Sequence, residues 1–162
     1  MRSILGIDPG TATTGFGLIT ENKTGLEIIQ YGVISTDPDL RMEKRLEIIY
    51  IKISELIKHF NPAVCAVEKL FFQRNVTTAI SVGQARGVIL LALSQQNIPC
   101  IEYTPLQVKQ AVTGYGVADK KQVQIMVRSI LNLPDLPKPD DASDALAIAI
   151  CHAHSQKILN LE

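Results

Sequence analysis

The sequence predicts an α/β fold built on a mixed five-stranded sheet, with three antiparallel strands followed by parallel strands and helices on both faces. Short apolar runs separated by turn residues occupy residues 1–35. From about residue 40 apolar residues recur every three or four positions, and helical and strand patterns then alternate. A meander followed by alternating helices and strands is typical of a mixed sheet that is covered on both faces.

The first 35 residues carry three strand patterns. Two segments between them, Asp8-Pro9-Gly10-Thr11 and Asn22-Lys23-Thr24-Gly25, contain the residue types that favour tight turns. A chain that reverses twice over so short a length forms neighbouring antiparallel strands. The expected strands are Ile4–Asp8, Thr14–Thr20 and Leu26–Ser35.

The rest of the chain alternates between helix and strand. Residues 40–60 are expected to form an amphipathic helix, because their apolar residues recur at helical spacing. Ala63–Glu68 is a continuous apolar run, as expected of a strand buried on both faces. Thr104 followed by Pro105 is typical of a helix start. The other expected elements are a strand over Ile98–Tyr103 and helices over 75–96, 105–114, 119–131 and 141–156.

Length and composition predict one domain over residues 1–162, which we expect in the cytoplasm. The chain is 46% hydrophobic and 20% charged, an ordinary globular balance. Its three cysteines are an odd number in apolar surroundings, which favours reduced packing residues. We expect neither a secretion signal nor a membrane partner, because no apolar run reaches transmembrane length.

The net charge of zero conceals an uneven distribution. Residues 69–138 contain eight basic and only three acidic side chains. A polyanion could contact one face of this segment. The same charges could equally be scattered over a solvated surface, and the sequence leaves both interpretations open.

Four carboxylates stand beside apolar segments, where a charge is costly to place. Asp8 and Glu68 end apolar strands, and Asp141 and Asp144 open the last apolar helix. A buried charge requires a partner or a metal ion, and Mg²⁺ and Mn²⁺ prefer carboxylate oxygens. If the first and fourth strands are neighbours, this set predicts a metal site for phosphoryl transfer.

Each carboxylate also has a structural explanation. The acidic residues at the start of the last helix could stabilise its N-terminus. Asp8 could form an Asx turn before Pro9, and Glu68 could pair with Lys69. The four carboxylates taken together favour the metal site.

The segment Cys151-His152-Ala153-His154 has the composition of a metal cluster. Residues one or two apart on a helix do not face the same way. We therefore interpret the segment as a helix end, with its histidines near the favourable C-terminal dipole.

Five short segments stand in order between Ile4 and His154. They are Gly6-Ile7-Asp8-Pro9-Gly10, Val67-Glu68-Lys69-Leu70-Phe71, Gly83-Gln84-Ala85-Arg86-Gly87, Val108-Lys109-Gln110 and Asp141-Ala142-Ser143-Asp144-Ala145-Leu146-Ala147. Together they resemble the RuvC-type Holliday-junction resolvases. The resemblance implies the RNase H-like fold. It also implies a structure-selective endonuclease of recombination and repair, which resolves four-way DNA junctions by paired nicks leaving 5′-phosphate and 3′-hydroxyl ends.

The resemblance also implies roles for individual residues. The family's acidic metal ligands correspond to Asp8, Glu68, Asp141 and Asp144. Such a site implies two Mg²⁺ or Mn²⁺ ions that clamp the scissile phosphate. Lys109 and Lys120 correspond to lysines near that phosphate, where positive charge stabilises the transition state. Arg74 and Lys121 are further candidates for DNA contact.

Phe71 corresponds to an aromatic residue that the family uses at the point of strand exchange. Two adjacent Phe residues, here Phe71 and Phe72, are more often part of a core. Neighbouring side chains on extended backbone point to opposite faces. We therefore expect Phe71 to stack on an unpaired base, which is worth about 1–3 kcal/mol.

Gly83 and Gly87 lie four residues apart on the expected helix over 75–96. Small residues at this spacing permit close approach, either to the chain's own sheet or to a second copy. The resemblance implies a homodimer formed through this helix, which matches the near two-fold symmetry of a four-way junction. It further implies a branch-migration motor as a partner.

Three other functions remain open at this point. A nuclease of the same fold could act on RNA or on RNA–DNA hybrid. The segment from Gly6 to Thr11 also resembles the first phosphate loop of actin, Hsp70 and sugar kinases, although those proteins need two such domains. A catalytically inactive junction-binding protein would not need four costly carboxylates.

Overall fold

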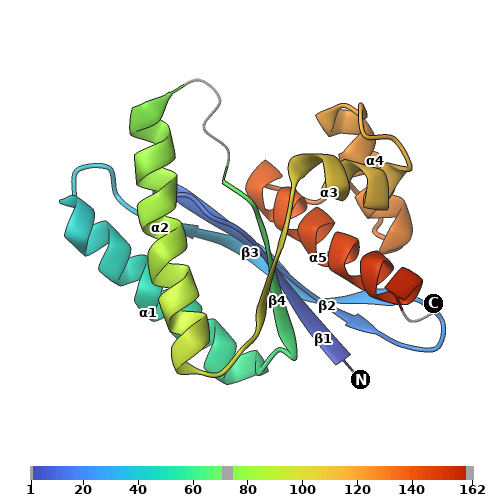
Figure 1. Cartoon of the computed structure of the whole chain (residues 1–162), viewed down its shortest axis with the longest axis horizontal. Helices are drawn as coiled ribbons and strands as arrows, with labels where there is room; N and C mark the ends of the chain where they lie inside the picture. The colour runs from blue at the N-terminus through green and yellow to red at the C-terminus, as the bar shows by residue number, and fades with distance from the viewer. Residues whose placement is uncertain (1, 71–74, 160–162) are drawn as a thin grey trace.

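The computed structural model describes residues 2–70 and 75–159, which fold around one five-stranded sheet (Figure 1). The strand order across the sheet is β3-β2-β1-β4-β5. The strands are β1 (Arg2–Asp8), β2 (Thr13–Glu21), β3 (Leu26–Ser35), β4 (Val64–Glu68) and β5 (Cys100–Tyr103). The helices are α1 (Met42–Phe60), α2 (Val76–Gln95), α3 (Pro105–Thr113), α4 (Lys120–Ile130) and α5 (Asp140–Leu159).

Pairing within the sheet follows the predicted mixed pattern. β1 pairs antiparallel with β2 and parallel with β4, β2 pairs antiparallel with β3, and β4 pairs parallel with β5. Strand β1 is therefore central, with a hairpin partner on one side and a crossover partner on the other. The prediction that the first and fourth strands are neighbours is confirmed.

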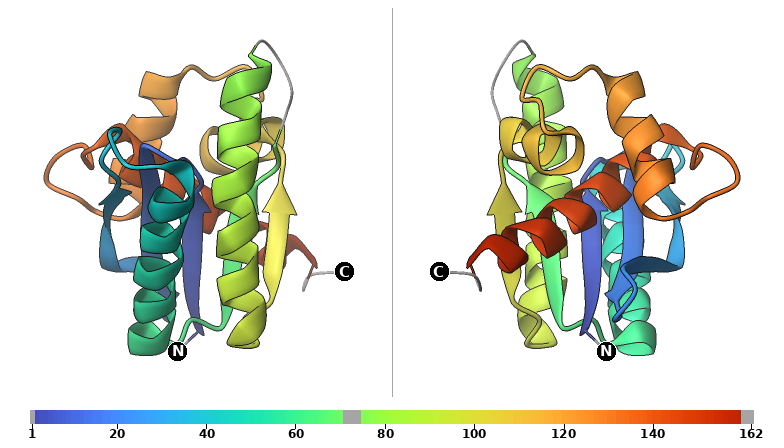
Figure 2. Two further views of the ribbon diagram at one scale, coloured as in Figure 1. Left: turned by 90° about the vertical axis from the view of Figure 1, so that its left-hand side faces the viewer. Right: turned by 90° about the vertical axis from the view of Figure 1, so that its right-hand side faces the viewer.

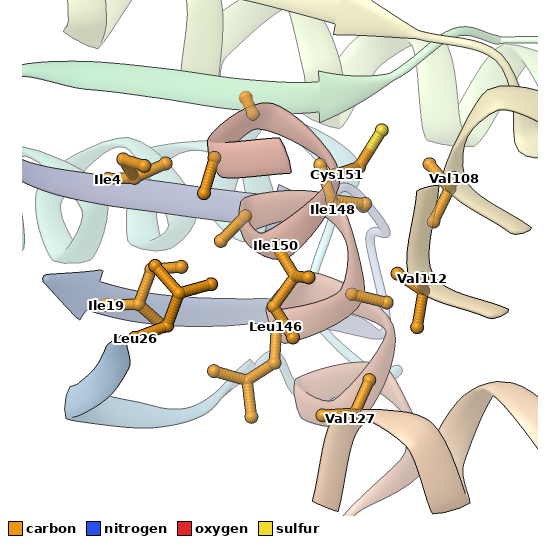
Figure 3. Close-up of a cluster of buried hydrophobic side chains, with 14 of the residues drawn as sticks. Ile4, Ile19, Leu26, Val108, Val112, Val127, Leu146, Ile148, Ile150 and Cys151 are labelled. Carbon is orange, nitrogen blue, oxygen red and sulfur yellow. The ribbon is translucent and has the colours of Figure 1, made fainter. Parts of the chain in front are cut away.

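Two layers of helices cover the sheet, α1 and α2 on one face and α3, α4 and α5 on the other (Figure 2). Because side chains alternate along a strand, neighbouring residues of β1 belong to different cores. Leu5 packs with the α1 and α2 side, while Ile4 packs with α5. Figure 3 shows the second of these cores, in which Leu146, Ile148 and Ile150 of α5 pack among residues of the sheet, α3 and α4.

Glycines in β1 and β2 allow α5 to approach the sheet very closely. A Cβ atom added at Gly6 would overlap the carbonyl of Ala145, and one at Gly15 would overlap the carbonyl of Asp141. Any larger residue at these positions would push α5 outward. This close approach is what brings the start of α5 to the end of β1.

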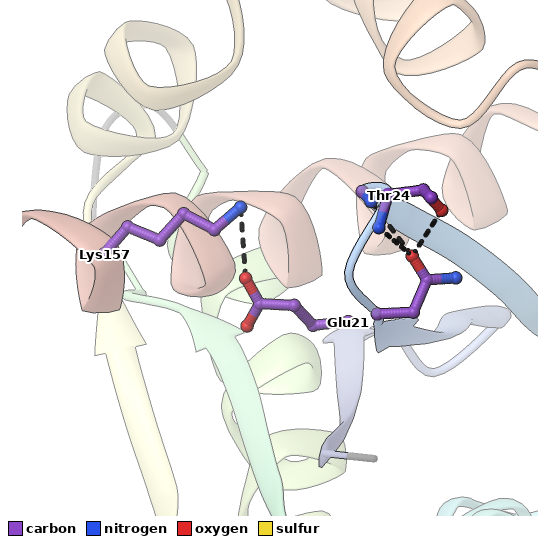
Figure 4. A network of polar contacts seen from close by, with 5 residues as sticks. Glu21, Thr24 and Lys157 are labelled. Carbon is purple, nitrogen blue, oxygen red and sulfur yellow. Dashed lines mark hydrogen bonds and ion pairs between the residues drawn. The ribbon is translucent and has the colours of Figure 1, made fainter.

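The far end of α5 is tied to the β2–β3 hairpin (Figure 4). Lys157 Nζ lies 3.0 Å from Glu21 Oε1. In the hairpin turn, the Asn22 side chain accepts hydrogen bonds from the backbone N–H groups of Thr24 and Gly25. Exposed ion pairs of this kind contribute about 0–1 kcal/mol, so the glycine contacts account for more of the docking of α5.

The predicted elements are confirmed, with differences at their ends. The third strand has the predicted bounds, and Thr104 caps α3 through a hydrogen bond from Gln107 N. The fifth strand begins at Cys100 rather than Ile98, because Asn97 has a positive φ of 57° and turns the chain. The last helix begins at Asp140 and continues to Leu159, three residues beyond the predicted end.

Helix α2 qualifies the expectation about membrane segments. By length and apolar composition alone it could cross a membrane. By this measure the expectation that no apolar run reaches transmembrane length was wrong. One side of α2 is buried in the core of the domain through Ala85, Ile89 and Leu93. Packing against the sheet therefore also accounts for the apolar composition of this helix.

Candidate active site

Asp8 and Glu68 lie at the same edge of the sheet. Each ends its strand, and the preceding residues Ile7 and Val67 are paired in parallel register. Both carboxylates line the same two pockets at this edge. The carboxyl ends of adjacent parallel strands are where ligands gather in α/β folds.

Helix α5 adds two more carboxylates to this edge. Carboxylate oxygens of Asp8, Asp141 and Asp144 all lie within 4.8 Å of one another. The two α5 residues share a face because they are three positions apart. Their proximity to β1 depends on Gly15, whose missing side chain leaves room for the backbone of Asp141.

The clustered acids strongly perturb the titration of Asp8. Burial, then the charges of Asp144, Asp141 and Glu68 in that order, and a hydrogen bond with Asp141 together raise its pKa to about 8. At neutral pH the metal-free protein therefore holds a proton on Asp8. A carboxyl group that is neutral near pH 7 marks a site that lacks compensating positive charge.

Glu68 and Asp144 are perturbed in the same direction. Burial and then the charge of Asp144 raise the pKa of Glu68, while Lys109 lowers it. Burial raises the pKa of Asp144 as well, with smaller contributions from Asp141 and Asp140, while Lys120 lowers it. The nearby lysines thus offset only part of the repulsion.

These residues fit a divalent cation. Three carboxylate ligands converge, each is partly buried, and the group can ionise fully only if positive charge enters it. Hard oxygen donors are what Mg²⁺ and Mn²⁺ prefer. Glu68 lies outside the group of three but beside Asp8 in both pockets, where it could complete the ligand set.

Two lysines face the carboxylates from α3 and α4. Lys109 lines both pockets. Lys120 Nζ lies 3.5 Å from carboxylate oxygens of both Asp140 and Asp144. Burial lowers the pKa of Lys120, but the two aspartates outweigh burial and raise it above its usual value. Lys121 is exposed and lines neither pocket.

Asp140 contributes differently from the other acids of α5. Its side chain is 65% exposed, pairs with Lys120 and accepts a hydrogen bond from Gln124 Nε2 at 3.1 Å. It lies outside the group of three carboxylates. Asp140 therefore orients Lys120, a role that the sequence did not indicate because it depends on where α4 packs.

Two adjoining pockets form the cleft around the carboxylates. Their volumes are about 230 and 360 Å³, and both include Asp8, Glu68, Pro105 and Lys109 in their walls. The first extends past Lys120 over an apolar floor. The second extends past Lys69 and Arg86, and Arg86 is ion-paired with Glu102 of β5. Basic residues of the segment 69–138 thus gather around the cleft, which favours the first of the two interpretations of their charge.

The structure decides between several structural alternatives. Among the described residues, no backbone N–H donates to the Asp8 carboxylate, as an Asx turn would require, and Glu68 forms no ion pair with Lys69. The expected roles of Phe71 and Arg74 fall outside the described residues.

Cys151, His152 and His154 do not belong to the group of potential metal ligands found among the described residues. The interpretation of this segment as a helix end was wrong, since α5 continues to Leu159. His152 is buried, and burial lowers its pKa, so the helix dipole does not hold it as a cation.

The chain is similar to proteins of one family along almost its whole length. A sequence profile described as crossover junction endodeoxyribonuclease RuvC matches residues 4–152. The protein of that name from Desulfitobacterium hafniense (strain DSM 10664 / DCB-2) is 59% identical over 157 residues, which cover 97% of this chain and 95% of the relative.

Solved structures give the same result. The T. thermophilus RuvC in complex with Holliday junction substrate is 36% identical with a TM-score of 0.92, covering 98% of this chain and 96% of that one. The yeast mitochondrial Holliday junction resolvase Ydc2 has a TM-score of 0.70 at 17% identity, covering 97% of this chain and 81% of that one. At that identity the likeness concerns the RNase H-like fold alone, which is the predicted fold.

Proposed function

The chain belongs to the RuvC family of crossover junction endodeoxyribonucleases, and on that premise we propose how its own residues cut DNA. It is a metal-dependent nuclease that binds four-way DNA junctions and resolves them in recombination and repair. The observation that carries the catalytic assignment is the convergence of Asp8, Asp141 and Asp144 within 4.8 Å at the end of a central strand.

We assign Asp8, Glu68, Asp141 and Asp144 as the metal ligands, with two Mg²⁺ or Mn²⁺ ions per active site. When bound there, such ions supply Lewis-acid activation and charge neutralisation for an in-line displacement at phosphorus. Asp8 must release its proton to act as a ligand, because its pKa is about 8 in the metal-free protein. The partly buried position of these carboxylates strengthens their electrostatic interactions.

Lys109 and Lys120 would act on the phosphate itself. They flank the carboxylates from two different helices, and both line the first pocket. Positive charge held at that position before the reaction stabilises the charge that develops on the phosphate oxygens. Asp140 and Asp144 hold Lys120 in place through its two ion pairs. The products would carry 5′-phosphate and 3′-hydroxyl ends.

Other parts of the cleft would hold the DNA. Lys69 and Arg86 extend the positive lining of the second pocket, where backbone phosphates could lie. Lys121 is exposed one residue from Lys120 and could contact DNA outside the cleft. Phe71 and Arg74 keep the roles expected from the resemblance, at the point of strand exchange and on the DNA backbone.

A homodimer through α2 is supported by the exposed face of that helix. Val76, Ile80 and Leu91 are 69%, 55% and 50% exposed. They share a face with Gly83 and Gly87, given their spacing along the helix. A Cβ added at Gly87 would meet nothing within 4 Å. Packing on the chain's own sheet therefore does not require this glycine, whereas a second copy of α2 could use the space.

We further propose that the chain acts as a single domain in the cytoplasm, together with a branch-migration motor. The first two proposals follow from length and composition, and the motor follows from the family. They are tested by limited proteolysis of the purified protein and by co-purification from cells.

Cleavage of a synthetic mobile four-way junction tests the central proposal. Linear duplex and RNA–DNA hybrid serve as control substrates, in Mg²⁺ and in EDTA, with Asp8→Asn beside the wild type. We expect paired, ligatable nicks on the junction alone, lost in EDTA and in the variant. Cleavage of the hybrid in place of the junction would instead support the alternative nuclease function.

A further inference from the structure

Three side chains late in α5, seven to ten residues beyond Asp144, connect this helix to β5 and α3. His154 Nδ1 lies 2.8 Å from the carbonyl oxygen of Ala111. Cys151 Sγ lies 3.6 Å from the carbonyl oxygen of Gln107. His152 Nδ1 lies 2.8 Å from the Tyr103 hydroxyl. We refer to Cys151, His152 and His154 as the α5 clamp.

The His154 contact has a defined direction. A carbonyl oxygen only accepts hydrogen bonds, so His154 Nδ1 must carry the proton and donate. Ala111 lies in the last turn of α3, where carbonyl groups lack a partner within the helix. His154 thus satisfies an acceptor that the end of α3 leaves open, and it fixes that end against α5.

The other two contacts act nearer the start of α3. Gln107 lies one turn before Ala111, and its backbone N–H and side chain complete the capping box with Thr104. Tyr103 immediately precedes that cap and is paired in register with Glu68. A thiol is a weak donor, so the hydrogen bonds of the two histidines are the stronger members of the α5 clamp.

Lys109 lies on α3 between the two anchored carbonyl groups. The same α5 that carries the clamp carries Asp144, and Lys109 and Asp144 line one pocket. The clamp therefore sets the position of Lys109 relative to the carboxylates by fixing one helix against the other. A metal-binding role does not fit, because the three side chains already contact separate partners along β5 and α3.

We propose that His154 is a positioning residue for Lys109, acting through the carbonyl of Ala111; this rests on the proposed role of Lys109. Loss of the hydrogen bond lets the end of α3 move and misplaces the lysine. A misplacement of about 1 Å in a catalytic group costs up to about 100-fold in rate. Junction affinity changes little, because the lysine acts mainly in the transition state.

Two substitutions of His154 by side chains of similar size distinguish the loss of the hydrogen-bond donor from the loss of packing. The Asn side chain of His154→Asn places an N–H near the position of Nδ1, whereas His154→Asp places only acceptor oxygens there. His59→Asn, at an exposed histidine of α1 on the opposite face of the sheet, is the control. Single-turnover cleavage in Mg²⁺ at saturating junction gives the rate, binding in EDTA gives the affinity, and melting temperatures verify folding.

We expect His154→Asn and His59→Asn to cleave close to the wild-type rate, and His154→Asp to be slower by about 10- to 100-fold at unchanged affinity. In a Lys109→Ala background His154→Asp should not slow cleavage further, because the effects of substituting residues that act as one unit are not additive. Equal rates for His154→Asp and the wild type would overturn the proposal, as would an equal loss with and without Lys109. Wild-type cleavage by Lys109→Ala alone would instead remove the proposed role of Lys109, and the positioning role with it.

Discussion

Replacing Asp8 with Asn should stabilise the metal-free protein at alkaline pH while abolishing cleavage. Asn has nearly the shape of a protonated Asp and no charge to desolvate. In the wild type, burial and three neighbouring carboxylates raise the pKa of Asp8 from 3.8 to about 8. The substitution removes the cost of ionising this group within the fold.

The sign and size of the effect follow from proton linkage. Because the folded pKa lies above the unfolded one, the folded state binds more protons between pH 3.8 and about 8. The Asp8 contribution to stability is therefore fully present below pH 3.8 and is lost as pH rises to about 8. Each pH unit is worth up to about 1.4 kcal/mol, so raising the pH from about 5.5 to 8 costs the wild type up to about 3 kcal/mol.

Urea unfolding in EDTA measures this difference directly. The free energies of unfolding of the wild type and Asp8→Asn should nearly coincide below pH 3.8 and diverge above it, because unfolded Asp8 ionises while folded Asp8 stays neutral. Between about pH 5.5 and 8.5 the stability advantage of the variant should grow by as much as about 3 kcal/mol. A stability difference that is the same at both pH values, or a variant that is less stable at the higher pH, would refute the assignment of Asp8 as the repelled carboxylate.

Four further outcomes are expected. Titrating Mg²⁺ or Mn²⁺ at about pH 8 should raise the melting temperature of the wild type more than that of Asp8→Asn, and an unchanged wild-type value would count against the metal site. Lys120→Ala should slow single-turnover cleavage by about 100-fold, whereas Lys52→Ala on α1 should not, and equal rates for the two would contradict the role of Lys120. Light scattering should show that Gly87→Gln converts a dimer to a monomer. Monomer stability should change little, because a Cβ at Gly87 meets nothing within 4 Å in the single chain. A wild-type protein that is monomeric at micromolar concentration would exclude the α2 dimer. Burial lowers the pKa of folded His152 below 6.5, so the stability that its neutral imidazole contributes above pH 6.5 is lost as the pH falls. Between about pH 7 and 5 the free energy of unfolding of His152→Asn, measured in urea, should therefore fall less than that of the wild type. Parallel curves for the two proteins would show that His152 does not titrate in this way.

Local chemistry was sufficient to predict most of the secondary structure. The strand Leu26–Ser35 and the cap at Thr104 depend on nearest neighbours, apolar period and turn residues, which the sequence displays directly. The start of β5 was missed because the apolar run from Ile98 does not reveal that Asn97 turns the chain. Backbone conformation at a single residue is set by packing as well as by residue type.

The clustering of the acids was also predictable, for a different reason. Asp8 and Glu68 each follow an apolar run, and parallel neighbours end at one edge, so their meeting requires only the order of the strands. Asp140 illustrates the limit of this reasoning. It stands directly before Asp141 in the sequence, yet its carboxylate faces Lys120 and Gln124 rather than the cluster.

By itself the sequence determined the α/β class, the order of the elements, the acidic set and the family, because these depend on residue type and on order along the chain. Only the tertiary structure decided how closely α5 approaches β1 at Gly6 and β2 at Gly15, and hence how strongly the pKa of Asp8 is raised. It alone placed Lys109 between the contacts that α5 makes with α3. Distances between segments far apart in sequence depend on side-chain packing across the whole core, and local pattern carries no information about them.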